Sequence, residues 1–281
     1  MERIVRTPDG RTLAVQEGGD PAGRPLLVHP GKPSSSRHQY GPFAADAAGR
    51  GLRVISYDRP GYGGSDSLPG RTTADCADDV RAICAALAID RLVMWGWSAG
   101  GPYVLACAAL LPDLVAAVAS LASLAPNDAD GLYDDDSRLL LTDPAAARAE
   151  LDKNREQILA ASVSEFVQGF ESVMSPADAV VVTGEWAEFL AYSAREALTP
   201  GSQGWWDDDR SAVIPWGFEL ASISIPVLLM HGRQDWFVPV SHGEWLAAHI
   251  PAVTARFLPD DGHLTLVNRL GEVHSWLAEY L

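Results

Sequence analysis

Basic residues are scarce in this sequence relative to acidic ones. Lysine and arginine together number 21, against 37 aspartate and glutamate residues, and the formal net charge is −16. A surface this acidic repels the phosphate groups of nucleic acids and of anionic lipids. We therefore expect neither nucleic acid nor a membrane surface as a partner, and we interpret the acidity as an aid to solubility.

Cysteine is scarcer still. The chain has three cysteines, Cys76, Cys84 and Cys107, an odd number without the spacing of metal-ligand pairs. Cys84 and Cys107 fall within apolar helical patterns, which indicates reduced thiols in the core and excludes a disulfide framework or a zinc site. No set of histidine, aspartate and glutamate residues has metal-ligand spacing either. We expect no metal and no cofactor.

Uninterrupted apolar runs of membrane length are also lacking. Residues 1–5 do not lead into a long apolar region with a cleavage site, so we expect no secretory signal and a cytoplasmic location. Residues 92–112 carry no charge and are long enough to span a bilayer. They are interrupted by Gly96, Ser98, Gly100, Gly101 and Pro102. A strand and a helix buried in a core explain this segment better than a membrane span.

What the chain does contain is the composition of a globular domain. Of its 281 residues, 47% are apolar and 21% are charged. Short apolar strands alternate with helical patterns, which predicts a mostly parallel sheet covered by helices on both faces, an α/β fold. The expected strands are an opening hairpin at 4–6 and 12–15, then 25–29, 52–57, 92–95, 115–121, 226–230 and 254–258. The expected helices are 40–48, 79–87, 103–111 and 269–281.

The alternation stops between residues 125 and 215. Helical patterns at 150–159, 165–174 and 184–198 have no strand partner there, and two runs of acidic residues, 134–136 and 207–209, suggest loops. We interpret 125–215 as a helical cap inserted into a core domain formed by 1–124 and 216–281. Its apolar anchors are Phe166, Phe170, Met174, Trp186, Phe189 and Leu190.

A glycine-rich turn around Ser98 is the strongest chemical signal. An apolar strand at 92–95 meets a helix at 103–111, and Gly96 and Gly100 stand two residues on either side of Ser98. A serine on a sharp strand-to-helix turn needs small neighbours at these positions, and the turn projects its hydroxyl from the sheet. The helix N-terminus that follows brings free N–H groups towards a developing oxyanion.

Five motifs in order make the chain resemble the α/β-hydrolase fold superfamily over essentially its whole length. They are His29-Pro30-Gly31-Lys32-Pro33, residues 58–65 (DRPGYGGS), residues 96–101 (GWSAGG), residues 231–235 (HGRQD) with Val238-Pro239, and Asp261-Gly262-His263. The resemblance implies a mostly parallel twisted sheet with helices on both faces and an inserted helical cap. Within the superfamily, residues 205–209 and 215–218 are similar to esterases related to aclacinomycin methylesterase.

The resemblance also implies a catalytic triad in the order nucleophile, acid, histidine. Ser98 is the nucleophile, Asp235 follows the strand at 226–230, and His263 follows the strand at 254–258. A serine hydroxyl needs a base to take its proton, and the imidazole needs a carboxylate to hold its tautomer. Asp128 is the alternative acid. The remaining histidines lack the order or the loop context for a direct role.

The individual expectations for those other histidines differ. His231 ends a strand and should be packed and hydrogen-bonded, and His38 lies beyond the loop at 29–33. Helix surfaces are the expected place of His242, His249 and His274.

The oxyanion hole should use two backbone N–H groups. One belongs to Ala99, directly after the nucleophile. The other comes from the loop after His29, with Lys32 as the preferred donor and Gly31 as the alternative, because proline cannot donate. The Lys32 side chain either meets a carboxylate or phenolate on the substrate or, as the simpler expectation, faces solvent or pairs with an acidic residue of the cap.

Aromatic residues beside the predicted triad could line an acyl or aryl pocket. Trp97, Trp236 and Phe237 are the candidates, whereas Trp95 is expected in the core. Arg59, in the second motif, is expected to fix a turn rather than to contact a ligand.

The sequence therefore predicts a serine hydrolase that cleaves a carboxylic ester through an acyl-enzyme, with a small-molecule ester as its partner. Family analogy suggests a methyl ester of a bulky or cyclic metabolite. The same triad serves lactonases, C–C hydrolases, lyases, perhydrolases and iminopeptidase-like enzymes, so these remain alternatives. A non-catalytic small-molecule binding protein is the less favoured class. The oligomeric state is left open.

Overall fold

A single twisted sheet organises the part of the chain that the computed structural model describes, which is residues 1–36, 41–127, 129, 132, 135–251 and 253–281. Its eight strands there have the order β1-β2-β4-β3-β5-β6-β7-β8. Strand β2 pairs antiparallel with β1 and β4, and the remaining neighbours are parallel. The bounds are β1 (Glu2–Arg6), β2 (Thr12–Gly19), β3 (Arg24–His29), β4 (Leu52–Tyr57), β5 (Leu92–Trp97), β6 (Val115–Leu121), β7 (Val227–Gly232) and β8 (Val253–Leu258).

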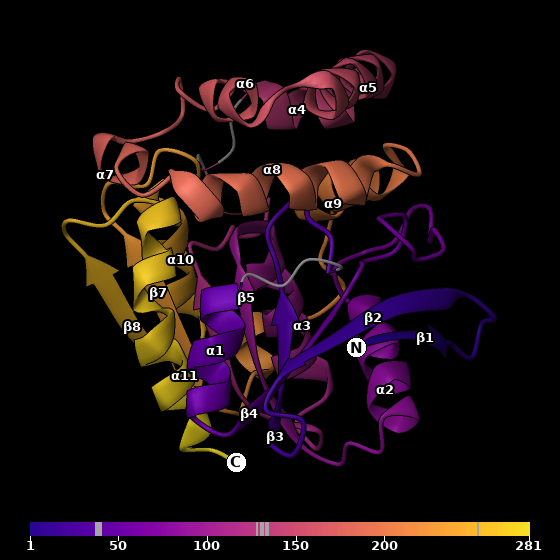
Figure 1. Ribbon diagram of the computed structural model, residues 1–281, viewed down its shortest axis with the longest axis vertical. Coiled ribbons are helices and arrows are strands. Elements are labelled where there is room, and N and C mark those ends of the chain that lie inside the picture. The colour runs from indigo at the N-terminus through magenta and orange to yellow at the C-terminus, as the bar shows by residue number, and fades with distance from the viewer. Residues whose placement is uncertain (37–40, 128, 130–131, 133–134, 252) are drawn as a thin grey trace.

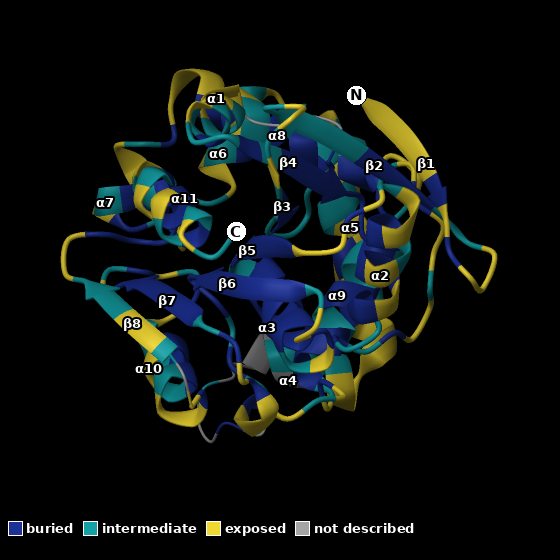
Figure 2. Ribbon diagram, turned by 90° about the horizontal axis from the view of Figure 1, so that it is seen from below, coloured by how far each residue is buried: buried dark blue, intermediate teal, exposed yellow. Residues whose placement is uncertain are grey.

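Helices cover both faces of this sheet (Figure 2). Helices α1 (Gly41–Gly49) and α11 (Leu270–Ala278) pack on one face, and α2 (Cys76–Ala86), α3 (Gly101–Leu110) and α10 (Val240–His249) pack on the other. Each face has its own apolar cluster, and every residue of β5, β6 and β7 is buried. Continuous apolar runs are what a parallel sheet covered on both faces requires. The predicted fold class is confirmed.

The connection between β6 and β7 carries the helices that lie above the sheet in Figure 1. Helix α8 lies between the sheet and a second tier that contains α5 and α6, and both of these contact it. The bounds are α4 (Asp135–Thr142), α5 (Pro144–Ala160), α6 (Val163–Gln168), α7 (Pro176–Ala179), α8 (Gly184–Leu198) and α9 (Gln203–Val213). We keep residues 125–215 as the proposed cap.

Several sequence expectations need correction here. The helix expected at 165–174 ends at Gln168, and residues 207–209 lie inside α9 instead of in a loop. Two of them, Asp207 and Asp208, are buried, because arginines of the core supply their partners. The acidic run at 134–136 begins outside the described residues, and its last two members start α4.

The three cysteines are free thiols buried in the core, as expected. Within the described residues, no helix combines the length and apolar character that a crossing of the bilayer demands.

A buried carboxyl group in α2 gives the fold a pH dependence. Asp79 is 1% exposed and pairs with Arg11 at 2.9 Å, yet burial raises its pKa to about 6 against that attraction. Because an unfolded aspartate titrates near pH 4, the folded protein holds a proton there between about pH 4 and 6 that the unfolded chain lacks. This contribution to stability is complete below about pH 4 and is lost as the pH rises through 6.

Replacing Asp79 by asparagine should remove this dependence. The free energy of unfolding of Asp79→Asn, relative to the wild type, should rise by about 2 to 3 kcal/mol between pH 4 and pH 7. Urea unfolding across that range measures it, with Asp78→Asn, exposed on the same helix, as the control for loss of a charge. Parallel profiles for wild type and Asp79→Asn would contradict the prediction.

Candidate active site

Ser98 stands at the carboxyl end of β5, where the chain turns sharply into a short 3-10 turn (Ser98–Gly100) and then α3. Its φ of +57° is in the left-handed region, which non-glycine residues rarely adopt. The turn is tight enough that a Cβ at Gly96 would lie 2.2 Å from the carbonyl oxygen of Gly100. A Cβ at Gly100 would in turn lie 2.0 Å from the carbonyl oxygen of His29. The sharp strand-to-helix turn expected from the sequence is therefore present, and the structure adds that Ser98 adopts a left-handed backbone within it.

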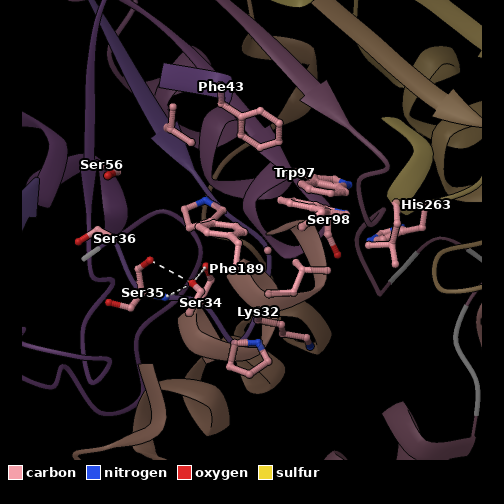
Figure 3. Close-up of a pocket in the computed structure, with 18 of the residues that line it drawn as sticks. Lys32, Ser34, Ser35, Ser36, Phe43, Ser56, Trp97, Ser98, Phe189 and His263 are labelled. Atoms are coloured by element: carbon pink, nitrogen blue, oxygen red, sulfur yellow. Dashed lines mark hydrogen bonds between the residues drawn. The ribbon is translucent and has the colours of Figure 1, made fainter. Parts of the chain in front are cut away.

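Asp235 and His263 come together at the same edge of the sheet. Asp235 follows β7, His263 follows β8, and the Nδ1 atom of His263 lies 2.7 Å from Oδ2 of Asp235. The other carboxylate oxygen accepts from the backbone N–H of Val238 at 2.7 Å. His263 and Ser98 line one cavity, and Figure 3 shows the serine hydroxyl on the side that faces the imidazole.

The surroundings of Asp235 keep it ionised. Burial by itself would raise its pKa, but the attraction of His263 and the hydrogen bonds from His231, His263 and Val238 outweigh burial and hold the pKa below its ordinary value. An ionised carboxylate on Nδ1 fixes the tautomer that leaves Nε2 of His263 able to accept a proton.

The other histidines considered in the sequence are either packed in the core or exposed on a helix, where they are described. His231 is fully buried, with Nε2 at 2.9 Å from the carbonyl oxygen of Val238, as expected for a packed residue. His242 and His274 were expected on helix surfaces, but both are buried, because α10 and α11 turn them towards the core. His249 is exposed on α10. Asp128 and His38 lie outside the described residues.

The loop after β3 lies directly against the serine. A Cβ at Gly31 would be 3.4 Å from Cβ of Ser98 and 3.9 Å from its Oγ. Lys32 lines the same cavity, and Ala99, the next residue after Ser98, is buried at the start of the 3-10 turn. Of the two candidate loop donors, Gly31 thus lies against Ser98, and Lys32 lines the same cavity.

The Lys32 side chain pairs with α9, in the proposed cap. Its Nζ donates to Oδ1 of Asp209 on α9, so the simpler of the two expectations for this lysine describes the structure.

A cavity of about 220 Å³ opens beside Ser98. Its apolar wall includes Phe43, Trp95, Trp97, Phe166, Phe170, Trp186, Phe189 and Phe237. Its polar wall includes Ser34, Ser35, Ser36, Ser56 and Ser193. Figure 3 shows Trp97, Ser98 and His263 on one side of the cavity and the serines at 34–36 on the other. The cavity therefore offers flat apolar surfaces near Ser98 and hydroxyl groups farther away.

Two aromatic rings flank the imidazole of His263. The ring centroids of Trp97 and Phe237 lie 5.9 and 5.0 Å from that of His263. Trp97 also stacks on Trp186 of α8 at 5.6 Å. The prediction of a pocket role is wrong for Trp236, which is 56% exposed and not among the residues that line the cavity. Its neighbour Phe237 takes the inward position, because adjacent side chains of a turn point in different directions.

The sequence did not predict every residue that lines the cavity. Phe43 and the serine wall were not predicted, because a lone phenylalanine or a run of serines resembles an ordinary loop or helix start. Ser193 could have been found from its spacing. It lies seven residues after Trp186, four after Phe189 and three after Leu190, which are steps that keep residues on one face of α8.

Candidate metal ligands are not grouped in the described part of the chain. No three histidine, cysteine, aspartate or glutamate side chains there are close enough together to hold a metal ion.

A family model for the alpha/beta hydrolase fold matches residues 24–270. The chain belongs to the α/β-hydrolase fold family. It is 27% identical over 247 residues to the bifunctional esterase/perhydrolase DCH of Acinetobacter calcoaceticus, with 84% of this chain and 83% of that protein covered. It is 26% identical over 254 residues to a non-heme haloperoxidase of Rhodococcus erythropolis, with 85% and 84% covered.

A solved structure of an alpha/beta hydrolase fold protein from Nakamurella multipartita is similar over the full length of this α/β-hydrolase. The alignment covers 100% of this chain and 99% of that one, with a TM-score of 0.72 and 26% identity. Residues 125–215 are therefore included in the similarity, together with the sheet.

Glycine at position 98 should stabilise this α/β-hydrolase. The left-handed backbone of Ser98 costs about 1 to 3 kcal/mol, and glycine adopts it without a Cβ. After about 0.5 to 1 kcal/mol is subtracted for the greater freedom of glycine in the unfolded chain, Ser98→Gly should gain about 1 kcal/mol. Denaturant unfolding measures it. Ser98→Ala, which keeps the Cβ, is the matched control and should not gain. Equal stability of the two variants would contradict the prediction, because it would limit the strain at this residue to the roughly 0.5 to 1 kcal/mol that the freedom of glycine costs.

Proposed function

We propose that this α/β-hydrolase is a serine hydrolase that cleaves a carboxylic ester. The observation that carries the proposal is the 2.7 Å contact of His263 Nδ1 with Asp235 Oδ2, next to a serine held in left-handed backbone on the same cavity. An acyl-transfer site consists of a carboxylate, an imidazole that it orients, and a serine on a strained turn, with the imidazole between the other two.

In the proposed reaction, Nε2 of His263 takes the proton from Ser98 while Oγ attacks the ester carbonyl carbon. The tetrahedral intermediate collapses when the imidazolium protonates the departing alkoxide, and an acyl-enzyme remains. Water, deprotonated by His263, attacks the acyl carbon, and the second intermediate releases the acid and regenerates Ser98. Asp235 keeps the imidazole oriented and stabilises its charged form.

The negative charge on the intermediates needs donors that are already in place. We assign them to the backbone N–H groups of Ala99 and Lys32, with Gly31 as the alternative to Lys32. Ala99 supports the assignment by its place after the nucleophile, and the loop supports it by its approach to Ser98. Each such donor typically contributes about 10²- to 10³-fold to kcat.

The walls of the cavity favour an ester with a flat ring that carries oxygen substituents. Trp97, Trp186 and Phe189 present stacked aromatic faces, which suit an aryl or cyclic group. On the polar side, the serines at 34–36 and Ser193 place hydroxyl groups along the cavity wall, and hydroxyl groups can donate to or accept from oxygen substituents of a substrate. An ester of a cyclic, oxygenated compound, such as a methyl ester, meets these requirements.

The decisive experiment measures hydrolysis of a p-nitrophenyl ester series and of hydroxylated and plain aryl methyl esters. We expect turnover by the wild type. The kcat of Asp235→Asn should be lower by about 10⁴-fold or more, and Ser98→Ala should lose more still. Labelling of Ser98 by a fluorophosphonate tests the nucleophile independently of the ester chosen. A wild type that is folded, unlabelled and inactive on every ester would refute the proposal and favour a binding protein.

Perhydrolysis is the second candidate, because a relative is named for both esterase and perhydrolase activities. Hydrogen peroxide would then replace water in the attack on the acyl-enzyme, and a peracid would be released. Peracid formation that exceeds acid formation at equal nucleophile concentration would assign the perhydrolase reaction to this site.

Lys32 should not discriminate between neutral and anionic substrates. Because its ammonium group is paired with Asp209, Lys32→Met should change kcat/KM for neutral and anionic aryl esters by the same factor, within about twofold. Lys153→Met, which removes an exposed lysine paired with Glu150, controls for the change in net charge. A loss confined to anionic esters, absent from Lys153→Met, would contradict the prediction.

A further inference from the structure

A carboxylate of the proposed cap contacts the loop that carries His263. Asp178, on α7, is fully buried, and its Oδ2 accepts from the backbone N–H of His263 at 3.0 Å. Its Oδ1 accepts from the N–H groups of Leu264 and Thr265 at 2.7 and 3.0 Å. These are the N–H groups at the start of the turn that follows His263, which have no partners within the turn itself. Asp178 thus fixes the backbone of His263, the proposed catalytic base.

The fit between this carboxylate and the loop is close. A Cβ at Gly262 would lie within 2.6 Å of the carboxyl carbon and both oxygens of Asp178. Ser175 Oγ donates to Oδ2 of Asp178 at 2.9 Å and so orients the carboxylate from its other side. A buried carboxylate with four donors is stable only while all of them stay in place.

A second cap carboxylate acts on the opposite part of the site through Arg59. Asp208 of α9 contacts the buried Arg59 guanidinium, with Oδ2 at 2.5 Å from one terminal nitrogen and 3.1 Å from Nε. The same guanidinium donates to the carbonyl oxygens of Pro30 and Gly31 at 2.7 and 3.2 Å. Arg59 therefore joins α9 to the loop that supplies the proposed oxyanion donor.

The direction of these bonds matters for the oxyanion hole. In a trans peptide the N–H points opposite to the C=O. Because the carbonyls of Pro30 and Gly31 both point at Arg59, the N–H groups of Gly31 and Lys32 point away from it. Both residues line the cavity beside Ser98, so Arg59 fixes the direction in which these candidate donors point.

Arg71 provides a built-in comparison for Arg59. It is also buried and also pairs with Asp208, at 2.6 Å, and its other contacts are Asp207 at 3.4 Å and the carbonyl oxygen of Gly204 at 3.1 Å. It shares the ion cluster and the burial of Arg59, but its contacts do not include the loop at 29–33.

We propose that the cap completes the catalytic site: Asp178 positions His263, and Asp208, through Arg59, positions the oxyanion loop. The inference rests on the proposed function. The two carboxylates come from α7 and α9, which flank α8 in Figure 1, so the helix that lines the cavity is fixed to the core on both sides. Asp178, Arg59 and Asp208 are positioning residues.

The first test compares Arg59→Lys with Arg71→Lys. A lysine keeps the charge but cannot bridge Asp208 and two carbonyls. Arg59→Lys should lower kcat for p-nitrophenyl acetate about tenfold or more with KM nearly unchanged, whereas Arg71→Lys should keep kcat within about twofold. Phenylboronic acid, whose adduct with serine is a tetrahedral anion, should bind Arg59→Lys more weakly by a similar factor. Equal losses in both variants would overturn the inference, because they would report only damage to the ion cluster.

Asp208→Asn is a second variant that tests the positioning of the loop at 29–33. It preserves side-chain volume and weakens the hold on Arg59, so it tests the loop if Arg59→Lys does not fold. The expected loss in kcat and in boronate affinity is the same.

The second test compares Asp178→Asn with Asp207→Asn. Asp207 is likewise a buried cap carboxylate that accepts from a core N–H, that of Gly70 at 3.0 Å, but at a turn that carries no predicted site residue. Asp178→Asn should lower kcat and the rate of Ser98 phosphonylation about tenfold or more, and Asp207→Asn should change neither by more than about twofold. Unchanged kinetics in Asp178→Asn would overturn the inference for His263.

The pattern of results separates this inference from the proposed function. A wild type that neither hydrolyses esters nor binds the boronate would refute both. An active wild type whose paired variants behave alike would refute the positioning roles and leave the serine hydrolase intact.

Discussion

The left-handed backbone of Ser98 is the constraint on which the arrangement of this protein depends. It brings the end of β5 so close to the start of α3 that Gly96 has no room for a side chain, and Gly100 has none because the carbonyl oxygen of His29 lies against it. The energy for this conformation comes from the surrounding packing. Strand β5 is buried along its whole length between β3 and β6, and α3 is buried over its first eight residues. A strained residue of this kind persists only where its neighbours determine it several times over.

The remaining parts of the site follow from the parallel order of the strands. Strands β3, β5, β7 and β8 run in the same direction, so the residues after them emerge at one edge of the sheet. The sheet brings Gly31, Ser98, Asp235 and His263 into one neighbourhood, but it does not fix the direction of their loops. Contacts from outside the sheet supply that direction, through hydrogen bonds to backbone groups of the loops at 29–33 and 262–265.

The sequence predicts those parts that depend on local chemistry and chain order. Ser98 is marked by its glycines, and Asp235 and His263 by their places after buried strands, so their neighbourhood could be anticipated. The inward Phe237 could not be distinguished from the outward Trp236, because a turn has no periodicity. Nor could the burial of Asp208 be foreseen. Acidic runs ordinarily face solvent, and its partners Arg59 and Arg71 are far away in the sequence.

The acidic run of α9, residues 207–209, contacts several segments of the core at once. Successive residues of a helix point about 100° apart. Asp207 accepts from Gly70, Asp208 from Arg59 and Arg71, and Asp209 from Lys32. The three carboxylates therefore contact three segments of the core between them, at Lys32, at Arg59 and at Gly70-Arg71. Part of the chain's acidity thus forms internal pairs instead of facing solvent.

These internal pairs limit how the proposed cap can move. Displacing α9 by more than a hydrogen-bond length would leave the guanidinium groups of Arg59 and Arg71 buried without Asp208. Breaking a buried pair in this way typically costs about 3 to 5 kcal/mol. Rotation of aromatic side chains in the cavity breaks no charge pair and costs far less. A swing of the whole proposed cap therefore costs more than side-chain motion in the cavity.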